Sequence, residues 1–164
     1  MAIYSESDSD FRPNIAAPAR FVETAAASTL AWTIVRVAAG IIPIPHAIPK
    51  LFLGFAPKLA AGVLGPLGFP EPLMVAYGLG VLELIFGTLL ILGLGTRIAA
   101  LAMVVQWTVI TVFVAIPKGW SYGSPGGGAE FPWIMVVIFF AIVVAGAGPW
   151  SLDRKLGTDR WPLK

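Results

Sequence analysis

Four long apolar segments, separated by stretches rich in proline, glycine or charge, set the pattern of this chain. They cover residues 24–45, 72–94, 97–116 and 132–148. An α-helix rises roughly 1.5 Å per residue, so about 20 apolar residues cross the roughly 30 Å hydrocarbon core of a bilayer. The fourth segment, with 17 residues, is at the short limit. Strands do not fit, because an open sheet edge would leave backbone groups without hydrogen bonds in lipid. The pattern predicts four membrane-spanning helices.

The connections between these segments predict which helices are neighbours. Only Gly95 and Thr96 separate the second segment from the third, which requires a tight antiparallel hairpin. The other two connections, residues 46–71 and 117–131, are rich in proline or glycine and are predicted to be irregular. The predicted fold class is an all-α membrane protein, an antiparallel bundle of four transmembrane helices over residues 24–148. Residues 1–23 form an N-terminal cytoplasmic or interfacial tail and residues 149–164 a C-terminal tail.

Basic residues are divided unevenly between the two sides of this bundle. Three of them, Lys50, Lys58 and Lys118, lie in the two long connections. Seven lie in the tails and the short hairpin: Arg12, Arg20, Arg97, Arg154, Lys155, Arg160 and Lys164. The acidic start of the chain does not resemble a secretory signal peptide. The positive-inside rule therefore predicts an inner (plasma) membrane protein with both termini in the cytoplasm, N-in and C-in.

Composition agrees with a membrane protein and limits its chemistry. Of 164 residues 57% are hydrophobic and 12% charged, and the mean hydropathy is +0.84, whereas a soluble domain has about a quarter of its residues charged. The net charge of +2 gives no footprint for nucleic acid. The chain has no cysteine and one histidine, which excludes disulfides, thiolate-bound iron–sulfur clusters, covalent haem and bis-histidine haem. Any redox role must use a diffusible cofactor such as a quinone, or centres on another subunit.

Three polar residues fall near the middle of the apolar segments, where charge is costly. Arg36 lies in the first segment, Glu83 in the second and Gln106 in the third. A charge at the centre of a membrane helix costs about 2.5–3.5 kcal/mol on insertion scales. We therefore expect Arg36 and Glu83 to pair inside the bundle, with Gln106 completing a buried polar layer. Two interpretations stay open: a structural pair that fixes helix register, or a site for a quinone headgroup or proton relay.

A second polar cluster is predicted at the outer end of the first segment. His46 and Lys50 are four residues apart and share a face if this stretch is helical, although Pro43, Pro45 and Pro49 favour a kink or a helix end. Glu130, just before the fourth segment, reaches the same side of the membrane. The cluster of His46, Lys50 and Glu130 is either a proton-handling or ligand-binding site, or a set of interfacial anchors. No metal site is predicted, because one histidine and one glutamate are too few ligands.

Small residues in the second segment predict close helix packing. Gly80 and Gly87 permit a neighbouring backbone to approach, as small residues do in membrane helices. None of the glycine-rich stretches has the remaining features of a phosphate-binding or dinucleotide-binding motif. We therefore interpret these glycines as packing positions.

Taken in order, several short motifs of this chain resemble those of the DoxX family of small four-helix membrane proteins, from the first helix to Leu156. They are Arg36 in the first helix, His46-Ala-Ile-Pro-Lys50-Leu-Phe, Gly68-Phe-Pro-Glu-Pro72, Leu82-Glu83-Leu with Gly87, Leu92-Gly-Leu-Gly-Thr96-Arg97, Gly127-Gly-Ala-Glu130-Phe-Pro, and Gly148-Pro-Trp-Ser151-Leu-Asp153. The family is similar to the small membrane subunit of a thiosulfate:quinone oxidoreductase. The resemblance implies a component of a redox-linked membrane assembly, and it supports the architecture better than any substrate.

Three functions are compatible with these observations. The first is an accessory subunit that anchors a larger membrane complex and is not catalytic alone. Its partners would be the lipid bilayer and other membrane subunits, or further copies of the chain. The second is a quinone-interacting oxidoreductase component, in which either polar cluster receives a quinone or a bound lipid. The third is a small transporter or proton pathway, which requires a polar channel that joins the two clusters.

Overall fold

The computed structural model describes the backbone of residues 17–158 and the side chains of residues 26–158. The regular elements within this range are all helices. The α-helices are α1 (Ala17–Ile41), α2 (Pro43–Phe52), α3 (Phe55–Leu59), α4 (Pro72–Leu92), α5 (Thr96–Val109), α6 (Glu130–Ala145) and α7 (Leu152–Leu156). Two π-helical turns, η1 (Ala60–Leu64) and η2 (Ile110–Ala115), and one 3₁₀ turn, η3 (Ile116–Lys118), follow α3 and α5. The prediction of an all-helical chain is confirmed.

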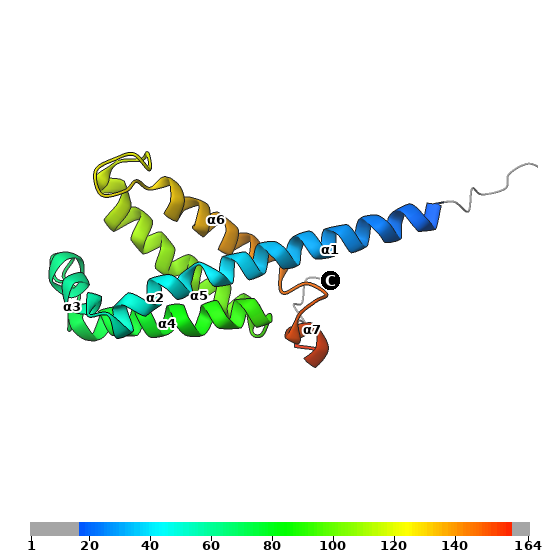
Figure 1. Cartoon of the computed structure of the whole chain (residues 1–164), viewed down its shortest axis with the longest axis horizontal. Helices are drawn as coiled ribbons and strands as arrows, with labels where there is room; N and C mark the ends of the chain where they lie inside the picture. The colour runs from blue at the N-terminus through cyan, green and yellow to red at the C-terminus, as the bar shows by residue number, and fades with distance from the viewer. Residues whose placement is uncertain (1–16, 159–164) are drawn as a thin grey trace, which may run out of the picture.

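The helices form two antiparallel pairs (Figure 1). α2 continues the line of α1 and lies along α4, while α5 and α6 run beside each other across them. Three helical segments are long and apolar enough to cross a membrane: Ala26–Phe52, Pro72–Leu92 and Thr96–Lys118. α6 is apolar but has only 16 residues. Three of the four predicted spans are therefore supported by length and composition.

The prediction that residues 46–71 are irregular is wrong for most of that stretch. Pro43 begins α2, and the Ile42 N–H donates to the Ala38 carbonyl, which connects α1 to α2. Pro49 lies inside α2 without ending it. The first helix consequently reaches Phe52, seven residues beyond the predicted end at 45. Residues 119–129, by contrast, contain no helix, as predicted for the third connection.

The predicted hairpin between the second and third segments is confirmed. α4 ends at Leu92 and α5 begins at Thr96, with Gly93 and Gly95 in left-handed conformations at φ +68° and +56°. A side chain at Gly93 would be strained, and its Cβ would also lie 1.6 Å from Arg36 Nη1. The turn therefore depends on glycine for its backbone conformation and for space.

One stripe of α4 packs against the first helix, through residues spaced three and four apart: Ala76, Gly80, Glu83, Gly87 and Leu90. Gly80 faces Leu51, and Gly87 faces Gly40 so closely that a Cβ on either would lie 2.7 Å from the other's carbonyl oxygen. The prediction that Gly80 and Gly87 are packing positions is confirmed. This close approach holds α4 directly against α1 and α2.

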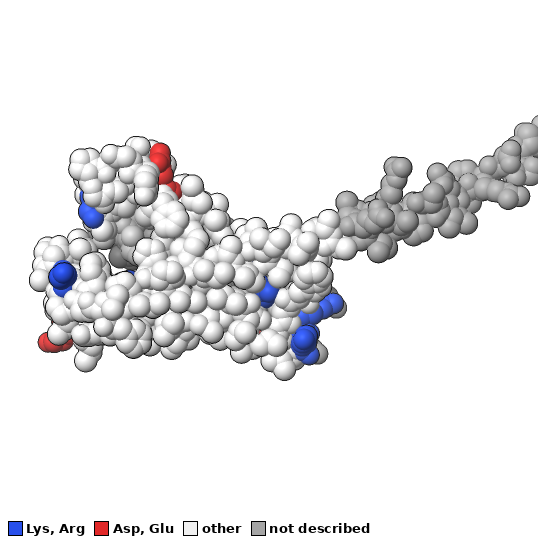
Figure 2. All heavy atoms as spheres, in the orientation of Figure 1, with Lys and Arg blue, Asp and Glu red and all other residues white. Residues whose placement is uncertain are grey.

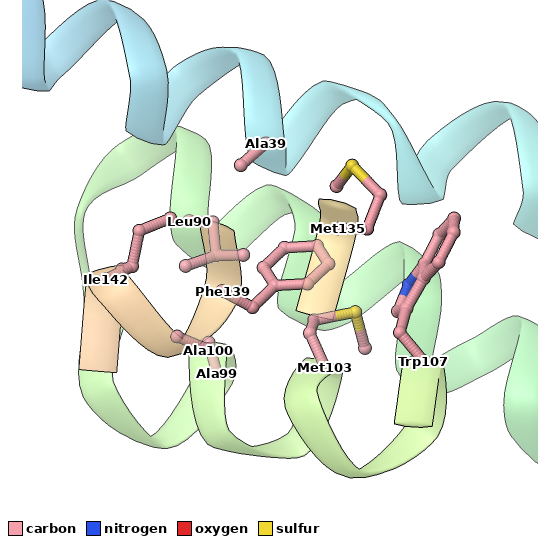
Figure 3. Close-up of a cluster of buried hydrophobic side chains, with 9 residues drawn as sticks. All are labelled: Ala39, Leu90, Ala99, Ala100, Met103, Trp107, Met135, Phe139 and Ile142. Atoms are coloured by element: carbon pink, nitrogen blue, oxygen red, sulfur yellow. The ribbon is translucent and has the colours of Figure 1, made fainter. Parts of the chain in front are cut away.

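An apolar core joins the two helix pairs (Figure 3). Phe139 lies at its centre, between Met103 and Met135, and Trp107 closes one end of it. The buried members of this core come from α1, α4, α5 and α6: Ala39, Leu90, Ala99, Ala100, Met103, Trp107, Met135, Phe139 and Ile142. Burial of these side chains fixes how α5 and α6 sit on α1 and α4.

Candidate functional site

A buried ion pair between α2 and α4 lies at the centre of the candidate site. Lys50 Nζ donates to Glu83 Oε2 at 2.7 Å, and Gln106 Nε2 of α5 donates to the other oxygen, Oε1, at 2.6 Å. Lys50 Nζ also donates to the His46 carbonyl at 2.7 Å. The exposed fractions of Lys50, Glu83 and Gln106 are 9%, 1% and 8%. We call these three residues, with His46, the polar centre.

The polar centre lies about halfway along the spanning helices. Glu83 is near the middle of α4 (Pro72–Leu92), and Gln106 is near the middle of Thr96–Lys118. An isolated charge there would be costly, so the pairing of opposite charges and the hydrogen bond from Gln106 offset much of the desolvation. Losing either charge would leave the other buried and unpaired.

Arg36 does not pair with Glu83, contrary to the prediction from sequence. Its guanidinium lies at Gly93, ten residues beyond Glu83 and therefore about 15 Å further along α4, and its Nη2 donates to the Trp150 carbonyl at 2.7 Å. The predicted depth assumed that the first helix ends at residue 45. Because the helix continues to Phe52, Lys50 takes the depth that was assigned to Arg36.

The two predicted polar clusters are also grouped differently. His46 and Lys50 lie on one helix, as expected, but they join Glu83 and Gln106 and so form a single site. Glu130 begins α6, and its Oε2 accepts from the Tyr122 N–H at 2.8 Å within the third connection. Among the described residues, no hydrogen bond or ion pair links Glu130 to His46 or Lys50. The structure therefore links His46 and Lys50 to Glu83 and Gln106, while Glu130 bonds within the third connection.

Aromatic rings border the polar centre. The exposed imidazole of His46 makes an edge contact with Trp107, at 5.7 Å between ring centroids, and Trp107 makes another with Phe131 at 5.6 Å. Figure 2 shows a hollow between the lobe formed by α3 and η1 and the lobe that follows η2. The polar centre therefore has aromatic rings on one side, and its His46 side chain is exposed.

Two buried polar atoms beside the ion pair have no partner among the described residues. They are Gln106 Oε1, an acceptor, and Trp107 Nε1, a donor. An unmatched buried polar group costs about 1–3 kcal/mol, so such groups normally have a partner. In the described part of the chain, no three His, Cys, Asp or Glu side chains come together as metal ligands would. The open positions suit a small polar group rather than a metal ion.

A second polar site, which sequence reasoning did not identify, lies at the C-terminal end of α4. The segment 146–158, which we call the C-terminal clasp, places the Asp153 carboxylate on the hairpin. Oδ1 accepts from the Gly95 N–H at 2.8 Å and Oδ2 from the Thr96 N–H at 2.9 Å. The sequence carries one signal for the clasp, because Ser151 begins α7 as an N-cap that accepts from the Arg154 N–H.

The clasp also binds the first helix. Besides the bond from Arg36 to the Trp150 carbonyl, Trp32 Nε1 donates to the Gly146 carbonyl at 3.0 Å. Burial alone would raise the pKa of Asp153. Hydrogen bonds from the Thr96 and Gly95 N–H groups and from the Thr158 hydroxyl outweigh burial, so the pKa is lowered. Asp153 is therefore held as a carboxylate at neutral pH.

Comparison with known proteins gives matches that agree with this architecture. The model of the DoxX family matches residues 31–116, which include all four residues of the polar centre. An uncharacterized membrane protein of Mycobacterium tuberculosis is 29% identical over 130 residues, covering 74% of this chain and 78% of its own length. An uncharacterized protein of Haemophilus influenzae is 34% identical over 121 residues, covering 73% of this chain and 86% of its own. No solved structure matches. The family match and these relatives together establish that the chain is a multi-pass membrane protein of the DoxX family.

Proposed function

We propose that this chain is an accessory subunit that anchors a larger, redox-linked membrane complex. The observation that carries the proposal is the reach of α1, which runs well beyond the other helices (Figure 1). Arg36 is level with the end of α4, so residues 17–35 extend about 28 Å past it. Leu30, Ile34 and Val35 in this extension are 47%, 57% and 40% exposed. An isolated helix is marginally stable, and a neighbouring subunit would cover this one. The redox link rests on the family resemblance.

The test is purification of the full chain from its native membrane in mild detergent, with mass spectrometry of everything that elutes with it. A stoichiometric second membrane protein is expected. The double substitution Leu30→Asn and Ile34→Asn on α1 should release that partner, whereas Thr88→Val, at an exposed position on α4, should retain it. Elution of the unaltered chain without any partner would contradict the proposal.

A second candidate is binding of a quinone headgroup at the polar centre. Its support is the site itself: a buried network of Lys50, Glu83 and Gln106, level with the middle of α4, with the exposed side chain of His46 next to it. A quinone with a decyl tail should bind saturably to the protein in lipid nanodiscs, and Lys50→Met should weaken that binding. Calorimetry that finds no saturable binding would exclude this function.

The third function, a transporter or proton pathway, has less support. It requires a polar route between the level of Arg36 and the polar centre. Between these levels α1 and α4 meet at Gly40 and Gly87, and the apolar core fills the space toward α5 and α6. We do not propose it.

The four-span topology with both termini in the cytoplasm belongs with this proposal. The distribution of Lys and Arg supports it, since seven lie on the side of the hairpin and tails, while Lys58 and Lys118 lie on the other and Lys50 is buried with Glu83. α6 has 16 residues and rises about 24 Å, which is shorter than the hydrocarbon core of a typical bilayer. Local thinning of the bilayer can accommodate this difference. The crossing by α6 is the step that most needs a test.

A further inference from the structure

The polar centre contains hydrogen-bonding positions that the described residues leave unused. Gln106 is 8% exposed, and its Nε2 donates to Glu83, but its buried Oε1 has no donor. The Lys50 ammonium carries three N–H groups, and the described residues accept two of them, through Glu83 Oε2 and the His46 carbonyl. One acceptor and one donor therefore remain open beside the same carboxylate.

The positions of these two groups restrict what can fill them. Lys50 and Gln106 bind the two oxygens of Glu83, so both open groups belong to one hydrogen-bonded network around a single carboxylate. A hydroxyl group both donates and accepts, and it satisfies both positions at once. A carbonyl oxygen could accept from Lys50, but it would leave Gln106 Oε1 without a donor.

Charge restricts the ligand further. The charges of Lys50 and Glu83 cancel, so the buried part of the site has no net charge to attract an ion. An anion or cation entering it would bring an uncompensated charge halfway into the membrane. The site therefore suits a neutral molecule.

The surroundings indicate the rest of the ligand. Trp107 and Phe131 lie in edge contact beside His46, and Trp107 Nε1 offers one more buried donor without a partner. Figure 2 shows a hollow between the two lobes, and the His46 side chain is exposed. The aromatic rings beside the polar centre favour a ligand with an apolar body.

We propose that the polar centre binds a neutral, lipid-soluble alcohol or phenol through its hydroxyl group, which donates to Gln106 Oε1 and accepts from Lys50 Nζ. The apolar body of the ligand packs against Trp107 and Phe131. This inference does not depend on the anchoring function. It differs from binding of an oxidised quinone, whose headgroup offers carbonyl acceptors and has no hydroxyl to donate; the reduced hydroquinone is a phenol and falls within this proposal.

The test uses two probes with the same apolar body, para-octylphenol and its methyl ether para-octylanisole. Binding to the full chain in nanodiscs is measured by titration calorimetry, with empty nanodiscs subtracted. Because only the phenol can donate to Gln106, we expect it to bind about tenfold more tightly than the ether. Gln106→Leu should reduce the binding of the phenol to that of the ether, whereas Thr88→Val should leave the difference unchanged.

Equal binding of the phenol and the ether to the unaltered protein would overturn the proposal. That result is expected if water alone fills the open positions. An unchanged preference in Gln106→Leu would also overturn it. Should that variant not fold, the indole N–H resonance of Trp107, assigned with Trp107→Phe, gives a second measurement on the unaltered chain. The chemical shift of this resonance should change more on addition of the phenol than of the ether. Equal changes would count against the proposal. The decyl quinone separates the two ligand proposals: its failure to bind excludes the quinone candidate alone, and binding as tight as that of the phenol removes the need for a hydroxyl.

Discussion

Arg36 and Lys50 are two basic residues of one continuous apolar helix, yet their surroundings differ. Lys50 is buried, and its Nζ lies 2.7 Å from Glu83 Oε2. Each of these two charges is compensated by the other. Arg36 lies at the end of α4, where its guanidinium reaches a backbone carbonyl of the clasp. Depth along the helix thus decides which cation neutralises Glu83.

A double-mutant cycle distinguishes the two cations. Glu83→Leu or Lys50→Met alone should destabilise the protein by about 3–5 kcal/mol, because the remaining charge is buried without a partner. The double variant should lose much less than the sum. Arg36→Met and Glu83→Leu should instead add within about 0.5 kcal/mol, because the two groups share no contact. Thermal unfolding in a fixed detergent measures all five variants, and strong coupling of Arg36 to Glu83 would contradict the assignment.

Asp153 should make attachment of the clasp sensitive to acid. Its pKa is lowered on folding, so its contribution to stability is complete above the ordinary value of 3.8 and is lost as pH falls through the lowered folded value. Limited proteolysis of the C-terminus should be slow and constant from neutral pH down to about pH 5, and faster in stronger acid.

The variant Asp153→Asn serves as the control for this titration. It keeps one acceptor for the two backbone donors of Gly95 and Thr96, and it cannot ionise. Proteolysis of this variant should be faster at neutral pH and should show less acceleration in acid. An equal acid response in both proteins would assign the effect to other groups.

At the scale of the element, hydropathy predicts the helices well and their ends less well. The α4–α5 hairpin was predictable because two residues cannot connect helices in any other way, and Gly93 and Gly95 suit the turn. The end of the first helix was not. Pro43 and Pro49 each remove one backbone N–H, which is a local loss, and the helical backbone continues through both. Mistaking these prolines for a helix end shifted the predicted depth and paired Glu83 with the wrong cation.

The contact between α1 and α4 should be intolerant of a single added methyl group. Gly87→Ala would place a Cβ 2.7 Å from the Gly40 carbonyl oxygen, so the helices must separate and the protein should lose about 1–3 kcal/mol. Gly78→Ala on the same helix meets nothing within 4 Å and should stabilise the protein slightly, because alanine is the better helix former. The comparison is made by thermal unfolding. Equal effects of the two substitutions would show that the close approach is not important.

At the scale of the whole molecule, the two polar sites lie at different levels and serve different parts of the fold. The clasp ties α1 to the α4–α5 hairpin at one end, where basic atoms gather beside α7 (Figure 2). The polar centre joins α2, α4 and α5 at the level of the middle of α4.

This topology can be tested directly because the chain contains no native cysteine. Single cysteines at Tyr122, which is 77% exposed between η3 and α6, and at exposed Lys155 in α7 report on the two sides of α6. With a membrane-impermeant maleimide, Tyr122→Cys should be labelled in intact spheroplasts, and Lys155→Cys only after permeabilisation. Labelling of both sites from the same side would mean that α6 does not cross and that the protein has three spans. Reversed labelling would keep four spans and invert the orientation, which would place the clasp on the outer side of the membrane.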